Sequence, residues 1–258
     1  SLHRSAARVA ALGALAASGL LAACGTAEAP GPLDPGGAVG RIRFVNLITD
    51  TTRGRVNAIL EGVPFGVNLT YGLSTPATLP APSTALYAPV LAGSRTLVLR
   101  RTADTTALVA TFPLTIAGNE DRTVYATGGA GGTAVTAFAT VDSNRVAAPA
   151  GQARVRLVHL SPTAGAVDVF VTAPNADLAA ATPTLAGVPL RAVSPYLTVP
   201  AGTYQVRAVP AGTAPAGRAA AVALTASLTL ASGNARTLVA ADNNVGGAPL
   251  RVVVLVDQ

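Results

Sequence analysis

The sequence predicts an all-β protein made of two tandem antiparallel β-sandwich domains, preceded by a signal peptide and a flexible linker. Hydrophobic residues make up 50% of the chain, which is enough for packed cores. Short apolar segments of Val, Leu and Thr alternate with turns that contain Pro and Gly, as is typical of strands. The second half of the chain repeats the first in order, which predicts two copies of one module.

The N-terminal residues 1–23 have the pattern of a bacterial lipoprotein signal peptide. Two Arg and no acidic residue precede an apolar run from Val9 to Leu20, which is too short to span a bilayer as a helix. The next five residues, Leu21, Ala22, Ala23, Cys24 and Gly25, resemble the bacterial lipobox. In this motif small residues fit the signal peptidase, and the thiol takes the lipid. The alternative is an ordinary signal-peptidase site with a cysteine nearby by chance.

We therefore expect Cys24 to be lipidated and to hold the protein on a membrane, because two or three acyl chains anchor a protein durably. Gly25, where some lipoproteins carry Asp, favours the outer membrane. The expected location is the bacterial cell envelope, at the outer membrane, its periplasmic face or the cell surface. Residues 24–39 are rich in Gly, Pro and Ala, and they predict a flexible tether that spans roughly 20 to 25 Å.

The internal repeat assigns residues 40–142 to a first module, 143–152 to a linker and 153–258 to a second module. The clearest matches are Arg41–Leu47 with Arg154–Leu160, Asn119–Val124 with Gly233–Leu238, and Thr140–Asp142 with Leu255–Asp257. The linker sequence, SNRVAAPAGQ, is polar and contains Pro and Gly, as expected of a boundary between domains.

Seven short apolar segments in the second module predict seven strands, a number typical of a sandwich. They are Val155–Leu160, Val167–Thr172, Ala192–Val199, Tyr204–Val209, Val222–Leu230, Thr237–Ala241 and Leu250–Val256. Turn residues such as Pro200-Ala201-Gly202 separate them. The only stretch with a helical pattern, Asp177 to Ala181, is too short to be more than a turn.

The second module carries the pattern R-x-R-x-V-H-x-S-P at Arg154–Pro162, then V-D-V-x-V at Val167–Val171 and Y-L-x-V-P-A-G-T-Y at Tyr196–Tyr204. These motifs resemble the domain of unknown function 4397 of exported bacterial proteins. The resemblance covers about four fifths of the chain. It implies tandem immunoglobulin-like sandwiches and says almost nothing about mechanism. The first module departs from the pattern at four places: Asn46 in place of His159, Asn57 in place of Asp168, no proline after Thr49, and Arg95 in place of Tyr204.

His159 is the one histidine downstream of the predicted signal peptide, and Ser161 and Asp168 lie close to it in sequence. Together they invite the hypothesis of a hydrolase triad. Strand alternation argues against it, because His159 shares a face with Val155 and Leu157 whereas Asp168 lies on the face opposite to Val167 and Val169. A β-bulge would break this alternation. We expect His159 to be a hydrogen-bonded structural residue at the end of a strand.

Two further motifs are interpreted as turns. Residues 129–134 fit the dinucleotide fingerprint G-x-G-x-x-A, but a strand-like segment follows where the fingerprint needs a helix, which favours a hairpin loop. The oxygen-rich clusters Asn119–Asp121 and Asp242–Asn244 could contribute ligands to Ca²⁺, but neither has the spacing of an EF-hand. No cofactor or metal is therefore predicted.

Arginine pairs occur at matching places in the two modules, at Arg41 and Arg43 and at Arg154 and Arg156. Alternation places them away from the sandwich core, so we expect a solvated strand face. The alternative is a docking face for an anionic glycan or lipid headgroup. The absence of Trp argues against a stacking platform for a carbohydrate, but Tyr71, Tyr87 and Tyr196 are candidate loop aromatics for such a ligand. A formal net charge of +6 without a dense basic stripe argues against nucleic-acid binding.

From these observations we expect a non-catalytic cell-envelope lipoprotein that serves binding, adhesion or spacing, with the membrane as its anchor and an envelope polysaccharide or protein as partner. The candidate ligand-binding residues are His159, Ser161, Asp168, Arg154, Arg156 and Tyr196. Two alternatives remain open: a hydrolase-like site around His159, and a surface stalk stiffened by Ca²⁺.

Overall fold

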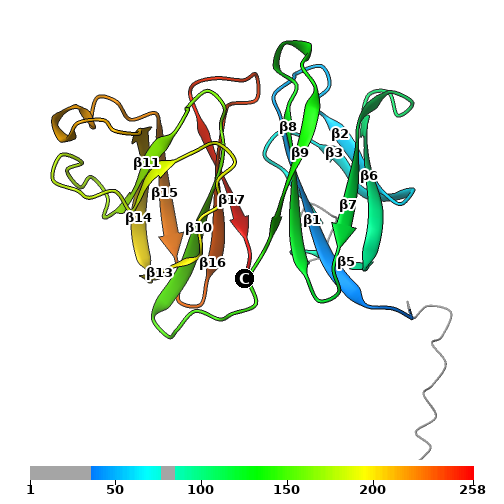
Figure 1. The fold of residues 1–258 in the computed structure, drawn as a ribbon, viewed down its shortest axis with the longest axis horizontal. Helices are drawn as coiled ribbons and strands as arrows, with labels where there is room; N and C mark the ends of the chain where they lie inside the picture. Colours follow the sequence, from blue (N-terminus) through cyan, green and yellow to red (C-terminus); the bar gives the residue numbers. More distant parts are fainter. Residues whose placement is uncertain (1–35, 77–84) are drawn as a thin grey trace, which may run out of the picture. The chain divides into compact units, whose positions relative to one another are not determined.

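The computed structural model describes residues 36–76 and 85–258, and in this part of the chain the regular structure consists of β-strands and two short 3₁₀ turns (Figure 1). The predicted all-β class is confirmed. The predicted signal peptide and the lipobox with Cys24 lie outside the described residues. No helix within the described ranges is long and apolar enough to cross a membrane.

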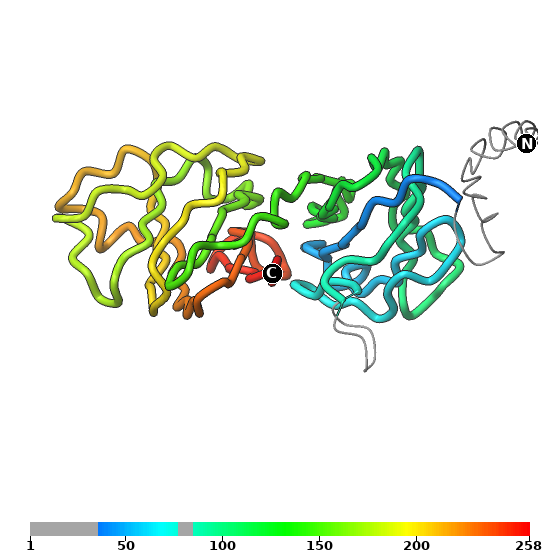
Figure 2. The backbone as a smooth tube through the Cα atoms, turned by 90° about the horizontal axis from the view of Figure 1, so that it is seen from below, coloured from blue at the N-terminus to red at the C-terminus, as the bar shows by residue number. Residues whose placement is uncertain are grey.

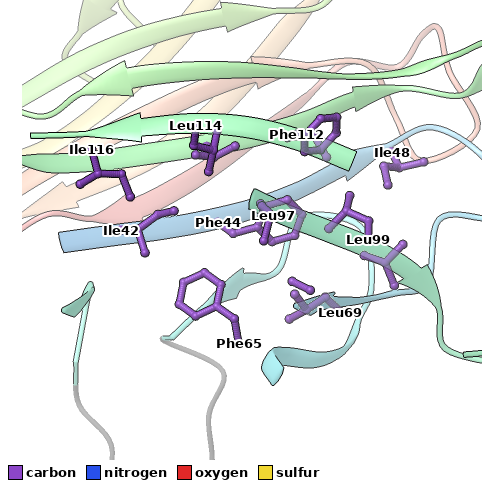
Figure 3. Close-up of a cluster of buried hydrophobic side chains, with 14 residues drawn as sticks. Ile42, Phe44, Ile48, Phe65, Leu69, Leu97, Leu99, Phe112, Leu114 and Ile116 are labelled. Atoms are coloured by element: carbon purple, nitrogen blue, oxygen red, sulfur yellow. The ribbon is translucent and has the colours of Figure 1, made fainter. Parts of the chain in front are cut away.

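Two sheets form the first module. Strands β4, β1, β8 and β9 are neighbours in that order, with β5 also paired to β1, and the second sheet has the order β3-β2-β6-β7. The strands are β1 (Val39–Ile48), β2 (Val56–Leu60), β3 (Val63–Leu69), β4 (Ser74–Thr75), β5 (Ala88–Leu91), β6 (Gly93–Arg101), β7 (Leu108–Ile116), β8 (Asp121–Gly128) and β9 (Val135–Val141). Alternate residues of facing strands fill the space between the sheets, among them Ile42, Phe44, Leu97 and Phe112 (Figure 3).

The second module repeats this arrangement with two four-stranded sheets, ordered β13-β10-β16-β17 and β12-β11-β14-β15. The strands are β10 (Gln152–Leu160), β11 (Val167–Thr172), β12 (Leu185–Val188), β13 (Leu197–Pro200), β14 (Gly202–Pro210), β15 (Leu224–Leu230), β16 (Ala235–Ala241) and β17 (Arg251–Val256). Its separate core includes Val155, Leu157, Val169, Leu228 and Leu238. The chain passes once from the first pair of sheets to the second, between β9 and β10 (Figure 2).

Seven of these eight strands correspond to the predicted segments, and β12 was missed. It has four residues, includes Gly187 at a φ of 62° and precedes a proline, so its sequence looks like a turn. The predicted strand Ala192–Val199 is also shorter than expected. Pro195 interrupts it, which leaves an isolated bridge at Val193 and the strand β13. Residues 177–181 form part of a loop, as predicted.

Most strand pairs are antiparallel, as predicted, but each module contains one parallel pair. Strand β1 runs parallel to β8, with Arg43 opposite Thr123, and β10 runs parallel to β16, with Arg156 opposite Thr237. In the first module the chain leaves this sheet after β1, returns to it at β4 and β5, and crosses again for β6 and β7. It then re-enters the first sheet at β8 from the end at which β1 begins, which makes the two strands parallel. The prediction of purely antiparallel sheets is therefore wrong for β1 with β8 and for β10 with β16.

A third apolar cluster lies between the modules and draws on the outer faces of β1, β8, β10, β16 and β17. Its buried members are Val45, Leu47, Tyr125, Val158, Leu160, Val239, Ala241 and Leu255. The inner faces of β1 and β10 meanwhile contribute to the two sandwich cores. These strands are therefore buried on both faces, and the contact between the modules has an apolar core of its own.

The segment predicted as a linker, residues 143–152, is hydrogen-bonded to both modules. Asn144 is buried and donates from Nδ2 to the carbonyl of Asp257 at 3.3 Å. Arg145 donates to both carboxylate oxygens of Asp121. The Pro and Gly of residues 143–152 are typical of a connection between modules. The polar side chains of Asn144 and Arg145 nevertheless fix this segment in place.

Candidate functional site

Two arginine–aspartate pairs cross between the modules. Arg43 on β1 donates from Nη2 to Oδ1 of Asp257, which follows β17, at 2.7 Å. Arg156 on β10 donates from Nη2 to Oδ1 of Asp142, which follows β9. Because Arg43 matches Arg156 and Asp142 matches Asp257 in the sequence repeat, the two pairs are reciprocal. We call these four residues the clamp.

Each clamp arginine is aimed by the strand that runs parallel to its own. The Nε of Arg43 donates to Oγ1 of Thr123 at 3.0 Å, and the Nε of Arg156 donates to Oγ1 of Thr237 at 2.8 Å. Each threonine hydroxyl then donates to the clamp aspartate of its own module: Thr123 to Asp142, and Thr237 to Asp257. The parallel register therefore sets the direction of both guanidinium groups.

A tyrosine covers each arginine and also bonds to an aspartate of the clamp. The ring centre of Tyr87 lies 4.5 Å from the guanidinium carbon of Arg43, and its hydroxyl donates to Oδ2 of Asp142 at 2.7 Å. In the second module the ring of Tyr196 lies 4.9 Å from Arg156, and its hydroxyl donates to Oδ2 of Asp257 at 2.9 Å. Such cation–π contacts exclude water from one face of each guanidinium.

The clamp charges are almost fully buried. The arginine side chains are 2% and 3% exposed and their aspartate partners 0%. Burial by itself lowers the pKa of Arg43, but the nearby Tyr87 and Asp257 outweigh it and raise that pKa above its ordinary value. The pKa of Arg156 is raised in the same way, with Asp142 and Tyr125 outweighing burial. Both guanidinium groups therefore stay charged, and separating the modules would break both ion pairs of the clamp.

The expectation of a solvated arginine face is wrong for Arg43 and Arg156, which are both buried. Alternation correctly placed them away from the sandwich core, but the other module covers that face. Their neighbours are partly exposed: Arg41 pairs with Asp121, and the guanidinium carbon of Arg154 lies 4.5 Å from the ring centre of Tyr196. Three candidate residues, Arg154, Arg156 and Tyr196, therefore come together at the clamp.

Sequence reasoning missed the two clamp aspartates. A signal was present, because Asp142 and Asp257 end matching segments of the repeat and each follows an apolar strand. An aspartate and an arginine that both recur in the repeat suggest an ion pair. The repeat does not show whether the two partners belong to the same module or to different modules.

The other three candidates, His159, Ser161 and Asp168, are not brought together. His159 is fully buried, and its Nε2 lies 2.7 Å from the carbonyl oxygen of Gly165. The Ser161 hydroxyl donates to Oδ1 of Asp242. Among the described residues no hydrogen bond joins the imidazole to the Ser161 hydroxyl or to Asp168. The imidazole holds the turn that follows β10.

Asp168 lies on the face of β11 opposite to the second core, as alternation predicted, but a loop covers it. Its carboxylate accepts hydrogen bonds from the backbone N–H groups of Gly187 at 2.7 Å and Gly212 at 3.2 Å. The neighbouring Phe170 packs on the same face with Leu178 and Val209 in a small separate cluster. Asp168 thus ties two loops to the sheet.

The predicted turn clusters use their oxygens within the protein. Asn119 accepts a hydrogen bond from Arg145, and Asp121 accepts from both Arg41 and Arg145. Asp242 accepts from Ser161, Thr163 and the backbone N–H of Gly247. Within residues 36–76 and 85–258 no group of three His, Cys, Asp or Glu side chains is arranged to hold a metal.

The predicted hairpin at residues 129–134 is confirmed. A 3₁₀ turn at Ala130–Gly132 joins the antiparallel strands β8 and β9, and no helix follows the glycines. A pyrophosphate would therefore meet no helix N-terminus here.

Comparison with known proteins gives one family. The model described as "Domain of unknown function (DUF4397)" matches residues 40–170 and 171–258, two segments consistent with two copies. The division between these matches falls inside β11. No curated protein matches the chain.

Two solved structures resemble the chain distantly. One is described as "Alpha-glucan binding by a streptococcal virulence factor"; it is 10% identical, with 80% of this chain and 94% of that chain covered and a TM-score of 0.23. The other is a leucine-rich repeat protein from Bacteroides thetaiotaomicron, 16% identical, with 78% of this chain and 26% of that chain covered and a TM-score of 0.19.

Proposed function

This chain belongs to the DUF4397 family, and from that premise we propose a non-catalytic module of the bacterial cell envelope in which the clamp makes two sandwiches into one rigid body. A lipid on Cys24 holds this body at a membrane, and its loops meet an envelope polysaccharide or protein. The single observation that carries the proposal is the reciprocal, buried pairing of Arg43 with Asp257 and of Arg156 with Asp142.

Rigidity follows from the chemistry of this contact. Domains of one chain move relative to each other by default unless their interface is extensive and apolar. Here the interface has an apolar cluster, and beside it four charges are removed from water. Leaving one buried charge unpaired costs roughly 3–5 kcal/mol, so partial opening is unfavourable. A module that only had to carry a flexible ligand-binding loop would need no such contact.

Spin-label distance measurements test the rigidity. One label is placed at Thr105 in the exposed β6–β7 turn and one at Ala216 in the exposed loop after β14, both as cysteines in the full chain with Cys24→Ser. We expect one narrow distance distribution. The double variant Asp142→Asn with Asp257→Asn should broaden it, whereas Arg55→Gln at an exposed position away from the clamp and from both labels should not. A broad distribution in the parent chain would overturn the rigid-body proposal.

Membrane fractionation tests the anchor. In a bacterial host the full chain should be found with the membrane fraction, and Cys24→Ser should release it or leave its leader uncleaved. Gly25→Ala, next to the proposed lipid site, serves as the matched control and should stay membrane-bound. Membrane association that survives the loss of the thiol contradicts the proposed lipid anchor.

A further inference from the structure

A cavity of about 240 Å³ lies beside the apolar contact between the modules and takes its walls from both of them. Leu47 and Leu160 line it as equivalent residues of β1 and β10, and both also belong to the cluster between the modules. Residues of the β8–β9 turn and of the segment after β12 form its sides, among them Thr133 and Arg191. The clamp holds these two walls in a fixed relation.

Arg191 has a backbone conformation that suggests a functional side chain. Its N–H donates to the carbonyl of His159 at 2.7 Å, and in the first module Gly72 donates to the carbonyl of Asn46 at the same distance. Because Asn46 matches His159 in the repeat, Gly72 and Arg191 occupy equivalent positions. Gly72 has a φ of 82° and Arg191 a φ of 64°. Glycine adopts this left-handed conformation freely and Asn tolerates it, but a long side chain such as arginine rarely does, and strained residues gather at binding sites.

The guanidinium of Arg191 is available to a ligand. Its one hydrogen bond in the described structure goes from Nη2 to Oγ1 of Thr136 at 3.3 Å, and no carboxylate lies within 4 Å of it there. Asp242 also lines the cavity, but its oxygens already accept from Ser161, Thr163 and Gly247. The cavity thus offers one unpaired positive charge.

Three hydroxyl groups of the lining, those of Thr49, Thr133 and Tyr71, present acceptors rather than donors. Thr49 donates its proton to the carbonyl of Gly128 at 3.0 Å, and Thr133 donates to the carbonyl of Ala130 at 2.8 Å. Tyr71 donates to the carbonyl of Asp242. Each of these oxygens keeps free lone pairs, so a complementary ligand must bring its own hydroxyl donors.

We propose that this cavity binds a hexuronate, the carboxylate-bearing sugar of acidic polysaccharides, as a free sugar or as a chain end. The guanidinium of Arg191 takes the carboxylate in the two-pronged geometry that suits this pair. The sugar hydroxyls donate to Thr49, Thr133 and Tyr71, and the carbon face of the ring lies against Leu47 and Leu160. The volume is below the roughly 300 Å³ of pockets for drug-sized ligands and therefore suits one sugar unit. The inference rests on the proposed binding role and names its ligand class.

Titration calorimetry on the full chain with D-glucuronate tests the proposal, with D-glucose and acetate as comparison ligands. We expect saturable binding of glucuronate, and neither glucose nor acetate alone should match it. Arg191→Asn removes the charge while keeping a residue that tolerates the left-handed conformation, and it should weaken binding by roughly ten- to a hundredfold. Arg251→Gln removes a nearby charge that does not line the cavity, and it should leave binding unchanged.

The outcomes separate clearly. Equal binding of glucose or acetate, or equal affinity of the Arg191→Asn and parent proteins, overturns the ligand assignment, and no saturable binding by any of the three overturns the site. Comparing a galacturonate tetramer with D-galacturonate distinguishes the two sources of the ligand. Tighter binding of the tetramer identifies a polymer end, and equal affinities identify the single sugar unit. Arg191→Asn leaves the clamp and Cys24 intact, so failure here does not disturb the spin-label or fractionation results.

Discussion

The guanidinium of Arg43 and the carboxylate of Asp257 meet at 2.7 Å although 214 positions separate them in the chain. This contact joins the first strand of one module to the residue that follows the last strand of the other. Its equivalent in the repeat makes the same contact in the reverse direction. The four residues involved are the part of the molecule whose substitution has the clearest expected effects.

Loss of one clamp partner should destabilise the protein strongly. Asp257→Ala removes the nearer of the two carboxylates beside the buried Arg43 and leaves only Asp142, at 3.6 Å, to compensate its charge. We expect a loss of about 3 kcal/mol in the free energy of unfolding, the lower end of the range for a broken buried pair. Arg43→Ala alone should be similarly costly, whereas the double variant should cost less than the sum by about 0.5–3 kcal/mol, because the two residues are in contact. Urea denaturation of the four proteins measures this coupling. Strict additivity would mean that the ion pair contributes nothing.

Acid should weaken the turn held by Asp242. Burial raises the pKa of this carboxyl, but hydrogen bonds from Ser161 and Thr163 outweigh burial and hold the pKa below its ordinary value of 3.8. A carboxyl with a lowered folded-state pKa contributes stability that is complete above the unfolded value and is lost as the pH falls through the folded value. Asp242→Asn should therefore flatten the decline in melting temperature as the pH falls below the ordinary carboxyl pKa of 3.8. A decline as steep as in the parent protein would argue against this assignment.

High pH should destabilise the contact between the modules, because its buried tyrosine hydroxyls deprotonate. Burial raises the pKa of Tyr125 to about 12 and raises those of Tyr87 and Tyr196 above their ordinary values. Each of these groups contributes stability that is complete below its unfolded pKa of about 10 and is lost as the pH rises through the folded value. Tyrosinate absorbance should rise in two stages, the second accompanied by unfolding. Tyr125→Phe should shift this second stage, and full titration near pH 10 without loss of structure would contradict the burial of these hydroxyls.

The two sandwich cores should respond separately to cavity-forming substitutions. Leu99→Ala in the first core and Leu228→Ala in the second remove buried side chains of the same type, and each should cost about 2–5 kcal/mol. Hydrogen exchange should accelerate mainly in the strands of the substituted module, because each core is made from its own two sheets. Equal acceleration in both modules after either change would indicate one cooperative unit in place of two.

Much of this architecture could be read from local patterns. The alternation of apolar residues located seven strands of the second module, and the glycines at 129–132 identified a hairpin because a strand-like segment follows them. Alternation also placed His159 and Asp168 on opposite faces of their sheets. These inferences succeed because a strand and its turn are determined by neighbouring residues.

The clamp could not be derived in the same way. Alternation shows that Arg156 points away from its own core, but it does not show what covers the outer face. Nothing local distinguishes a solvated arginine from one that meets an aspartate of another module. The strand β12 was not predicted for a related reason. Its own sequence favours a turn, and its pairing with β11 makes it a strand. Long-range pairing decides both cases.

The reciprocal clamp also makes the chain resemble a dimer whose two subunits have been fused end to end. Each module presents an arginine and an aspartate to a partner that presents the same two groups, so a second chain offers an equally complementary surface. What favours closure within one molecule is the short connection from β9 to β10, which keeps the two halves at a high effective concentration. Shortening that segment should therefore hinder closure within one chain and favour an exchange of halves between neighbouring chains.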